Sequence, residues 1–241
     1  MIAQAAFDLR LLLRNGEQLL LTIIIPIALL LAATYVAAVP LAEPAGSGRL
    51  PEALGGVLAV AIIASAFTSL AIGIGFDRRS GALVMLATTP LSRVDILGAR
   101  IIAALAVTAV QTLVLVGTAL AMGWRPGPQS LALVPLAILG TACFAALGFA
   151  LGGAVRAEAT LAIANAVFLV LVALGGTAIP AASLPPVLAA AVSVLPSSAL
   201  GDLLRWSTGY PGTGGLAVDV ALLVAWGLLG AAVARRTFAW R

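Results

Sequence analysis

The side chains able to carry out chemistry in this chain are arginines and a few isolated polar residues. All thirteen basic residues are Arg, and the sequence contains no Lys and no His. A phosphate-binding loop of the GxxxxGK[ST] type and a Schiff base both need Lys, and His is the commonest general base. We therefore predict no catalytic residue here, and any ATP hydrolysis that drives this protein must take place on another chain.

The single cysteine, Cys143, lies within an apolar stretch. One Cys cannot form an intrachain disulfide, and without His a cluster of metal ligands is not expected. We predict that this chain binds neither a metal nor a cofactor.

Four uncharged polar residues, Ser65, Thr68, Gln111 and Asn165, fall inside long apolar stretches. Polar groups at such depth must face protein or water, because lipid offers them no hydrogen bond. They are candidates for a substrate pathway, with the alternative that they only form hydrogen bonds within or between helices. Asp219 is the only acidic residue within such a stretch, and it lies near the start of that stretch.

The composition is that of an integral membrane protein. Hydrophobic residues make up 62% of the 241 residues and charged residues 9%, with a mean hydropathy of +1.17. Uncharged windows cover 18–42, 53–76, 101–124, 126–155 and 159–201, and a sixth apolar window covers 214–234. Each reaches the roughly 20 residues that a helix needs to cross a bilayer. We predict an all-α fold with six transmembrane helices in a single membrane domain, 1–241.

The arginines set the expected orientation. With six spans and both termini in the cytoplasm, ten of the thirteen Arg fall on the cytoplasmic side, and only Arg49, Arg125 and Arg205 lie outside. Two full crossings within 159–201 would export the last three Arg, against the positive-inside rule. The same rule accounts for the basic pI near 10.6 without any nucleic-acid partner.

The longest charged and turn-rich segment between two predicted spans is 77–92. It begins with Asp77-Arg78-Arg79, continues through an apolar piece, 82–88, and breaks at Thr89-Pro90. Ser92 and Asp95 then have the spacing of a capping box, which predicts a new helix that continues into the third span.

Two further segments are predicted to lie at the membrane surfaces. Residues 1–16 have an apolar face and a polar face, which favours an interfacial helix over a frayed start of the first span. Residues 180–212 contain five prolines and two short helical stretches, the second capped by Ser197 or Ser198. Because 187–195 carries no charge, we predict an external, half-inserted hairpin instead of an ordinary surface loop, with Ser207 accessible from outside.

Gly140, Phe144, Gly148 and Gly152 recur every four residues on one face of the fourth predicted span. Small residues at this spacing let two helices approach closely. We expect a tightly packed neighbour along this face.

These features resemble the ABC-2 type permeases of bacterial ATP-binding cassette exporters, including the daunorubicin-resistance group. The resemblance is carried by FDLRLLLRN near the start, DRRSGALVMLATTPLSRVDILGAR at 77–100 and LPSSALGDLLRW at 195–206. The central segment matches that family's recurrent pattern at Gly81, Leu83, Leu86, Thr89, Pro90, Leu91, Ser92 and Arg93. It departs from the pattern at Ala82 and Val84, where the family commonly has Thr and Glu.

The resemblance implies that 77–92 holds a coupling helix that rests on a separate ATPase. The implied coupling residues are Arg78, Arg79, Gly81, Leu83, Met85, Leu86 and Pro90. It also implies two permeases, identical or paralogous, joined through their first and fifth spans, and two ATPase subunits that bind ATP and Mg²⁺. The location would be the bacterial cytoplasmic membrane, and the cargo a drug-like or lipid-like amphipathic molecule.

Two other functions are alternatives to an ATP-driven exporter. A secondary transporter driven by an ion gradient would normally place titratable residues inside the membrane, and Asp219 is the only candidate. A membrane enzyme or assembly factor is disfavoured by the lack of His, Lys and paired carboxylates within a span.

Overall fold

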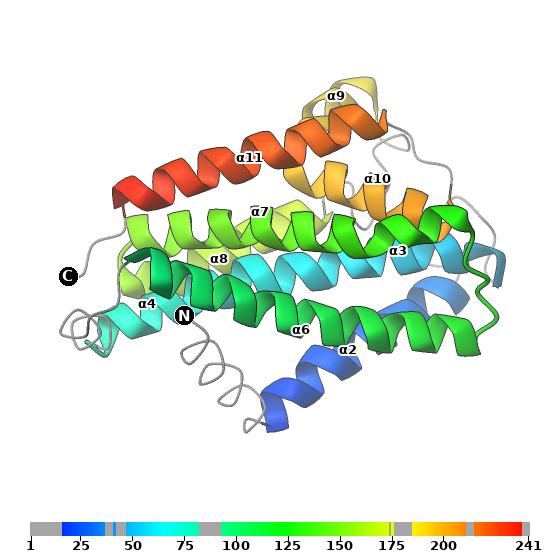
Figure 1. Cartoon of the computed structure of the whole chain (residues 1–241), viewed down its shortest axis with the longest axis horizontal. Coiled ribbons are helices and arrows are strands. Elements are labelled where there is room, and N and C mark those ends of the chain that lie inside the picture. Colours follow the sequence, from blue (N-terminus) through cyan, green and yellow to red (C-terminus); the bar gives the residue numbers. More distant parts are fainter. Residues whose placement is uncertain are drawn as a thin grey trace.

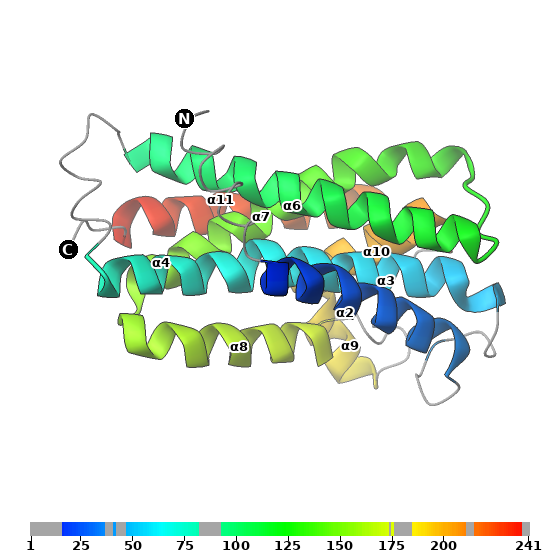
Figure 2. The same ribbon diagram turned by 90° about the horizontal axis from the view of Figure 1, so that it is seen from below.

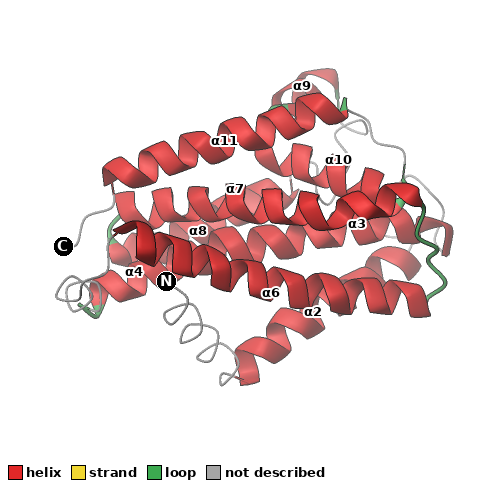
Figure 3. Ribbon diagram, viewed as in Figure 1, coloured by secondary structure: helices red, strands yellow, loops and turns green. Residues whose placement is uncertain are grey.

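The computed structural model describes residues 16–36, 41, 47–81, 93–173, 175, 185–210 and 215–237. Every regular element within these ranges is helical, which confirms the predicted all-α fold (Figures 1 and 3). The predicted interfacial helix at 1–16 lies almost wholly outside these residues. The elements in chain order are α2 (Gly16–Tyr35), η1 (Ser47–Arg49), α3 (Leu50–Ile62), η2 (Ile63–Thr68), α4 (Ser69–Arg79), α6 (Arg93–Ala121), η3 (Pro128–Ala132), α7 (Leu133–Ala154), α8 (Ala157–Ala173), α9 (Pro186–Ser193), α10 (Pro196–Thr208) and α11 (Leu216–Thr237).

The long helices run side by side in one bundle with two distinct ends (Figures 1 and 2). At one end α4, α7 and α11 finish and α6 and α8 begin. We call this the arginine end, because Arg78, Arg79, Arg100, Arg156, Arg235 and Arg236 lie near it. The opposite end holds α9, α10 and the start of α3, and we call it the hairpin end.

Four helices are long and apolar enough to cross a membrane: Leu50–Arg79, Gly98–Ala121, Pro128–Ala154 and Leu216–Arg236. The described parts of the first and fifth predicted spans, Thr22–Tyr35 and Ala157–Ala173, are apolar but shorter. At 1.5 Å per residue, the 17 residues of α8 extend about 26 Å, short of the roughly 30 Å hydrocarbon core. The described residues thus give four clear spans.

The bent pair formed by α9 and α10 is compatible with either a broken span or a re-entrant hairpin. Its two axes differ by 88°, in agreement with the predicted pair of short helices. The predicted cap is wrong, since α10 begins at Pro196 after Leu195 and no side chain caps it, so that Ser197 and Ser198 lie inside the helix. Proline at the first helical position has no N–H to satisfy, which removes one reason for a cap.

The glycines of α7 pack directly against the second span, as their spacing predicts. A Cβ on Gly148 would lie 2.7 Å from the carbonyl oxygen of Phe67, and one on Gly152 would lie 2.9 Å from that of Ala71. A Cβ on Gly140 would lie 2.5 Å from a methyl group of Leu200. The prediction of a closely packed face is therefore confirmed.

The second span is one continuous helix with a π-helical stretch, η2, at its centre, a feature that the sequence did not predict. Wider turns of this kind leave irregular backbone bonding and are frequent at functional sites. Here the Ser69 hydroxyl donates to the carbonyl of Ala64 five residues earlier (3.1 Å).

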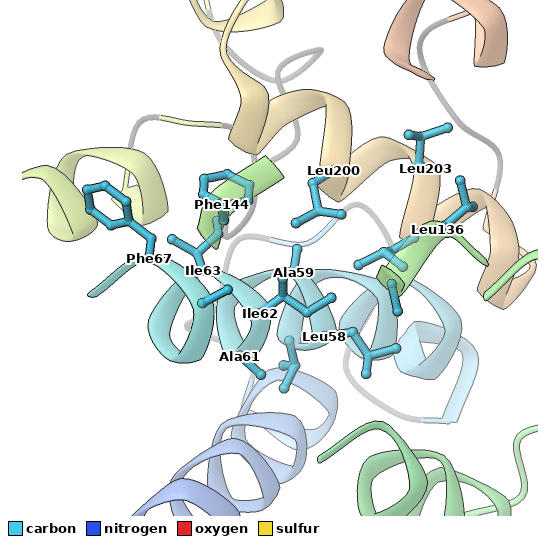
Figure 4. Close-up of a cluster of buried hydrophobic side chains, with 14 of the residues drawn as sticks. Leu58, Ala59, Ala61, Ile62, Ile63, Phe67, Leu136, Phe144, Leu200 and Leu203 are labelled. Carbon is cyan, nitrogen blue, oxygen red and sulfur yellow. The ribbon is translucent and has the colours of Figure 1, made fainter. Parts of the chain in front are cut away.

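The buried apolar core joins the second span, α7 and α10. Figure 4 shows side chains of α3, η2, α7 and α10 converging, among them Ile62, Phe144 and Leu200. Every residue of α10 except Trp206 is buried. The expectation that Ser207 is exposed is wrong, because its side chain faces this packed interior and its hydroxyl donates to the carbonyl of Leu204 (2.7 Å).

Candidate functional site

The last turns of α4 form the base of the predicted coupling segment. Arg78 is half-buried, and its Nη1 donates to the carbonyl oxygens of Gly152, Gly153 and Val155 at 3.1, 3.3 and 2.8 Å. α7 ends at Ala154, and the last carbonyls of any helix lack partners within it. A cation at this position satisfies them and opposes the negative end of the helix dipole.

An ion pair between Asp77 and Arg100 connects α4 to α6 at the same level. Asp77 is the first residue of the predicted coupling segment and Arg100 follows the segment, so the pair joins the two helices on either side of it. α4 ends at Arg79, and Gly81 has a φ of +73°. A glycine in this left-handed conformation is a common way for a chain to leave a helix.

Arg79 points away from these contacts. Its side chain is exposed, and it lines a small pocket of about 60 Å³ between α4 and α8 together with Phe76, Glu158 and Leu161. The other predicted coupling residues, Leu83, Met85, Leu86 and Pro90, lie outside the described residues. α6 runs from Arg93 to Ala121, in agreement with the predicted helix that continues into the third span, and the predicted cap Ser92 lies outside the described residues.

Three of the four candidate pathway residues come from two elements that pack together. Ser65 and Thr68 lie on η2, Asn165 lies near the middle of α8, and α8 packs against both η2 and α4. The Ser65 hydroxyl donates to the carbonyl of Ile62 (3.3 Å). The Thr68 hydroxyl oxygen is buried without a hydrogen-bond partner among the described residues. Asn165 is exposed on the outer face of α8.

Gln111 lies apart from the other three, on α6. Its Nε2 donates to the carbonyl oxygen of Thr22 on α2 (3.1 Å), and only 5% of the residue is exposed. This bond supports the interhelical alternative for Gln111, since it attaches α2 to the bundle.

At the hairpin end a group of charged side chains is buried, which sequence reasoning missed. Arg49, Glu52, Asp202, Arg205 and Asp219 are between 0% and 8% exposed. The predicted topology places Arg49 and Arg205 outside and does not predict the burial that the structure shows for both. The spacing of Arg49 and Glu52, and of Asp202 and Arg205, places opposite charges three residues apart. That spacing indicates paired charges, but it also occurs on exposed helix faces and so does not predict their burial.

Opposite charges lie together around Arg205. Arg205 Nη1 lies 3.3 Å from Asp202 Oδ1, and both Asp202 and Glu52 attract the Arg205 guanidinium. Arg49 Nη1 donates to the carbonyl of Val36 (3.2 Å). Unpaired charges at this depth would cost several kcal/mol each, so Glu52, Asp202 and Arg205 act as one structural unit.

Neutral hydrogen bonds hold α10 in place around this group. The Thr208 hydroxyl donates to the carbonyl of Pro51 (2.7 Å), and Trp124 Nε1 donates to the carbonyl of Thr208 (2.9 Å). The Ser130 hydroxyl donates to the carbonyl of Ser207 (3.0 Å). The hairpin is therefore part of the bundle and not a loop lying on its surface.

A family model described as "ABC-2 family transporter protein" matches residues 17–235. This range includes every described helix except the first residue of α2 and the last two of α11. No curated protein matches the chain.

Proposed function

The chain belongs to the ABC-2 transporter family, and we propose that it is the membrane-spanning permease of an ATP-driven exporter whose ATP is hydrolysed by a separate subunit. The match to the family over 17–235 carries this proposal. The absence of Lys from the whole sequence is consistent with it, because a nucleotide-binding loop needs that residue. The proposed cargo is a drug-like or lipid-like amphipathic molecule, in keeping with a pathway between apolar helices.

The proposed topology has six spans and both termini in the cytoplasm of a bacterial cell. Ten of thirteen Arg then lie on the cytoplasmic side, which is the bias that orients membrane proteins. In this arrangement α2 and α8 belong to the first and fifth spans. The pair α9 and α10 enters from the outside and returns without crossing.

Cysteine labelling tests this topology. In a Cys143→Ser background, we expect Ser193→Cys on α9 to react with an impermeant thiol reagent in intact cells. Arg156→Cys, at the arginine end, should react only after the cells are permeabilised. Both positions are exposed, so accessibility within the protein does not bias the comparison. The opposite pattern would reject the proposed orientation.

The proposed ATPase contact is the segment 77–92, whose two flanking helices are joined by the pair of Asp77 and Arg100. An ATPase in the cytoplasm reaches the permease at this end only. ATP and Mg²⁺ would be bound by that partner.

The proposed cargo pathway runs along α8 and η2 and is completed by a second permease, identical or paralogous. Asn165 supports this, because an amide on the exposed, largely apolar face of α8 is costly against lipid and favourable against another polar surface. Figure 2 shows α8 at one edge of the bundle, where a second copy has access to it. Ser65 and Thr68 lie on the element beneath.

Transport by the reconstituted pair tests the function. The permease is co-expressed with a candidate ABC ATPase from the same genome, and a fluorescent amphipathic dye is added outside inverted vesicles. We expect dye accumulation that needs ATP and disappears when the phosphate-loop Lys of the ATPase is replaced by Ala. Accumulation that needs an ion gradient and no ATP would instead support the secondary transporter, with Asp219→Asn as its diagnostic variant.

A further inference from the structure

We infer that Arg78 is a positioning residue that transmits movement of the coupling segment to the turn between α7 and α8, and so to α8 itself. This inference rests on the proposed function. It assigns Arg78 to contacts within the permease. The neighbouring Arg79 belongs to the same sequence motif but does not make these contacts.

The contacts of Arg78 join two places that are far apart in the sequence. Its Nη1 reaches the carbonyl of Val155 at 2.8 Å, together with those of Gly152 and Gly153. α8 begins at Ala157, two residues after Val155. Charge-assisted bonds of this kind are roughly twice as strong as neutral ones. The end of α4 and the turn that starts α8 therefore move together.

Close packing of α4 against both α7 and α8 limits the relative movement of these helices near Arg78. A Cβ on Gly75 would lie 3.1 Å from Cβ of Thr160 on α8. A Cβ on Gly152 would lie 2.9 Å from Cβ of Ile74 on α4. Backbones that approach this closely transmit a displacement instead of absorbing it. One stretch of α4 thus contacts both α7 and α8 immediately before the coupling segment.

α8 can follow a displacement of α4, because few other elements pack against it. It packs chiefly on α4, with further contacts to η2 and α7, while most of its other face is exposed. The same helix carries Asn165 of the proposed pathway. A shift of α4 that is passed through Arg78 would therefore tilt α8 relative to α7.

Arg79 provides a matched control. It is the next residue in the coupling segment and carries the same charge, but it is exposed and makes no hydrogen bond or ion pair among the described residues. Replacement of either arginine by Gln removes one positive charge from the same turn. Only replacement of Arg78 removes the bonds to the end of α7.

The experiment compares wild type, Arg78→Gln, Arg78→Lys and Arg79→Gln, each reconstituted with the ATPase. For Arg78→Gln we expect about tenfold less cargo transported per ATP hydrolysed, measured in the purified complex with the ATPase. Lys retains a donor for the carbonyls and should restore part of this ratio. Both arginines lie in the proposed ATPase contact, so either variant can weaken co-purification, but Arg79→Gln should keep the wild-type ratio in the complex that does form.

A purely structural role for Arg78 predicts a different result. Arg78→Gln would then lower the melting temperature and the amount of folded protein, with an unchanged ratio of transport to ATP hydrolysis in the folded fraction. That outcome, or an equal loss in Arg79→Gln, would overturn the inference. Failure of the wild type to bind any ATPase would instead reject the proposed function.

A second measurement does not depend on the folding of Arg78→Gln. A spin label at Arg156→Cys, in the Cys143→Ser background, reports on the turn between α7 and α8 from an exposed position. We expect its spectrum to change when ATP is added to the complex. No change under conditions in which cargo is transported would contradict the inference.

Discussion

The two ends of the bundle carry their arginines in opposite ways. At the arginine end the side chains of Arg79, Arg156 and Arg235 are exposed. At the hairpin end Arg49 and Arg205 are each only 1% exposed, and Arg205 lies close to the carboxylates of Asp202 and Glu52. An exposed arginine remains available to lipid head groups or to a partner, whereas a buried one is committed to its neighbours. We infer that the buried charges at the hairpin end stabilise the fold. Those at the arginine end contact a partner and transmit movement between helices.

The largest effect is expected at the buried group. Arg205→Met would leave Asp202 and Glu52 buried without their shared cation, and breaking such a pair costs about 3–5 kcal/mol. We expect a large fall in melting temperature in detergent and a low yield of folded protein. Arg125→Met is the control, because Arg125 lies at the same end but is exposed. Similar stability for the two variants would contradict the assignment of the buried group as a structural unit.

The close contact of α3 with α10 offers a second way to disturb the hairpin end. A Cβ on Gly55 would lie 2.5 Å from Cα of Arg205, so Gly55→Val forces backbone movement at a cost of about 1–3 kcal/mol. Thermal unfolding of the purified permease would measure the loss. The matched variant is Gly117→Val on α6, where nothing lies within 4 Å of the added Cβ. If Gly117→Val were the more destabilised, the packing argument would fail.

At the arginine end the expected effects are on association. Leu86→Asp lies in the proposed coupling segment, and it would remove an apolar contact and add an unpaired charge at the ATPase surface. Loss of roughly 1.5–3 kcal/mol of apolar burial weakens binding at least about tenfold. The measurement is co-purification with the ATPase and cargo-stimulated ATP hydrolysis at equal membrane abundance. Unchanged values in both would reject the coupling role.

The smallest effect on stability is expected for the ion pair of Asp77 with Arg100. Its side chains are 25% and 21% exposed, and pairs in contact with solvent contribute about 0.2–1 kcal/mol. Asp77→Asn should therefore change the melting temperature far less than Asp202→Asn, which alters a pair with one side chain only 1% exposed. An equal fall in melting temperature for both variants would contradict the difference in stabilisation between the two ends. High salt should weaken the contribution of Asp77 and leave that of Asp202 nearly unchanged.

The sequence alone predicted features that depend on local pattern. Apolar length located the long spans, and the four-residue spacing of Gly148 and Gly152 predicted the packed face of α7 that the structure confirms. The helical pattern after Thr89-Pro90 predicted a helix that continues into the third span, and α6 covers Arg93–Ala121. The motif around Gly81 and Pro90 indicated the family. These signals need only neighbouring residues, because helix periodicity and solvation by lipid act on short segments.

Tertiary structure decided everything that depends on residues far apart in the chain. Arg78 and Arg79 are indistinguishable in the sequence, and only the fold brings Val155 to one of them. The pair of Asp202 and Arg205 has the same spacing as a surface pair on any helix, and it is buried because α10 packs against α3. That packing joins Thr208 to Pro51, 157 residues apart. Burial is a property of the assembled bundle, so charge content and local spacing could not predict which arginines would lie in water and which in the core.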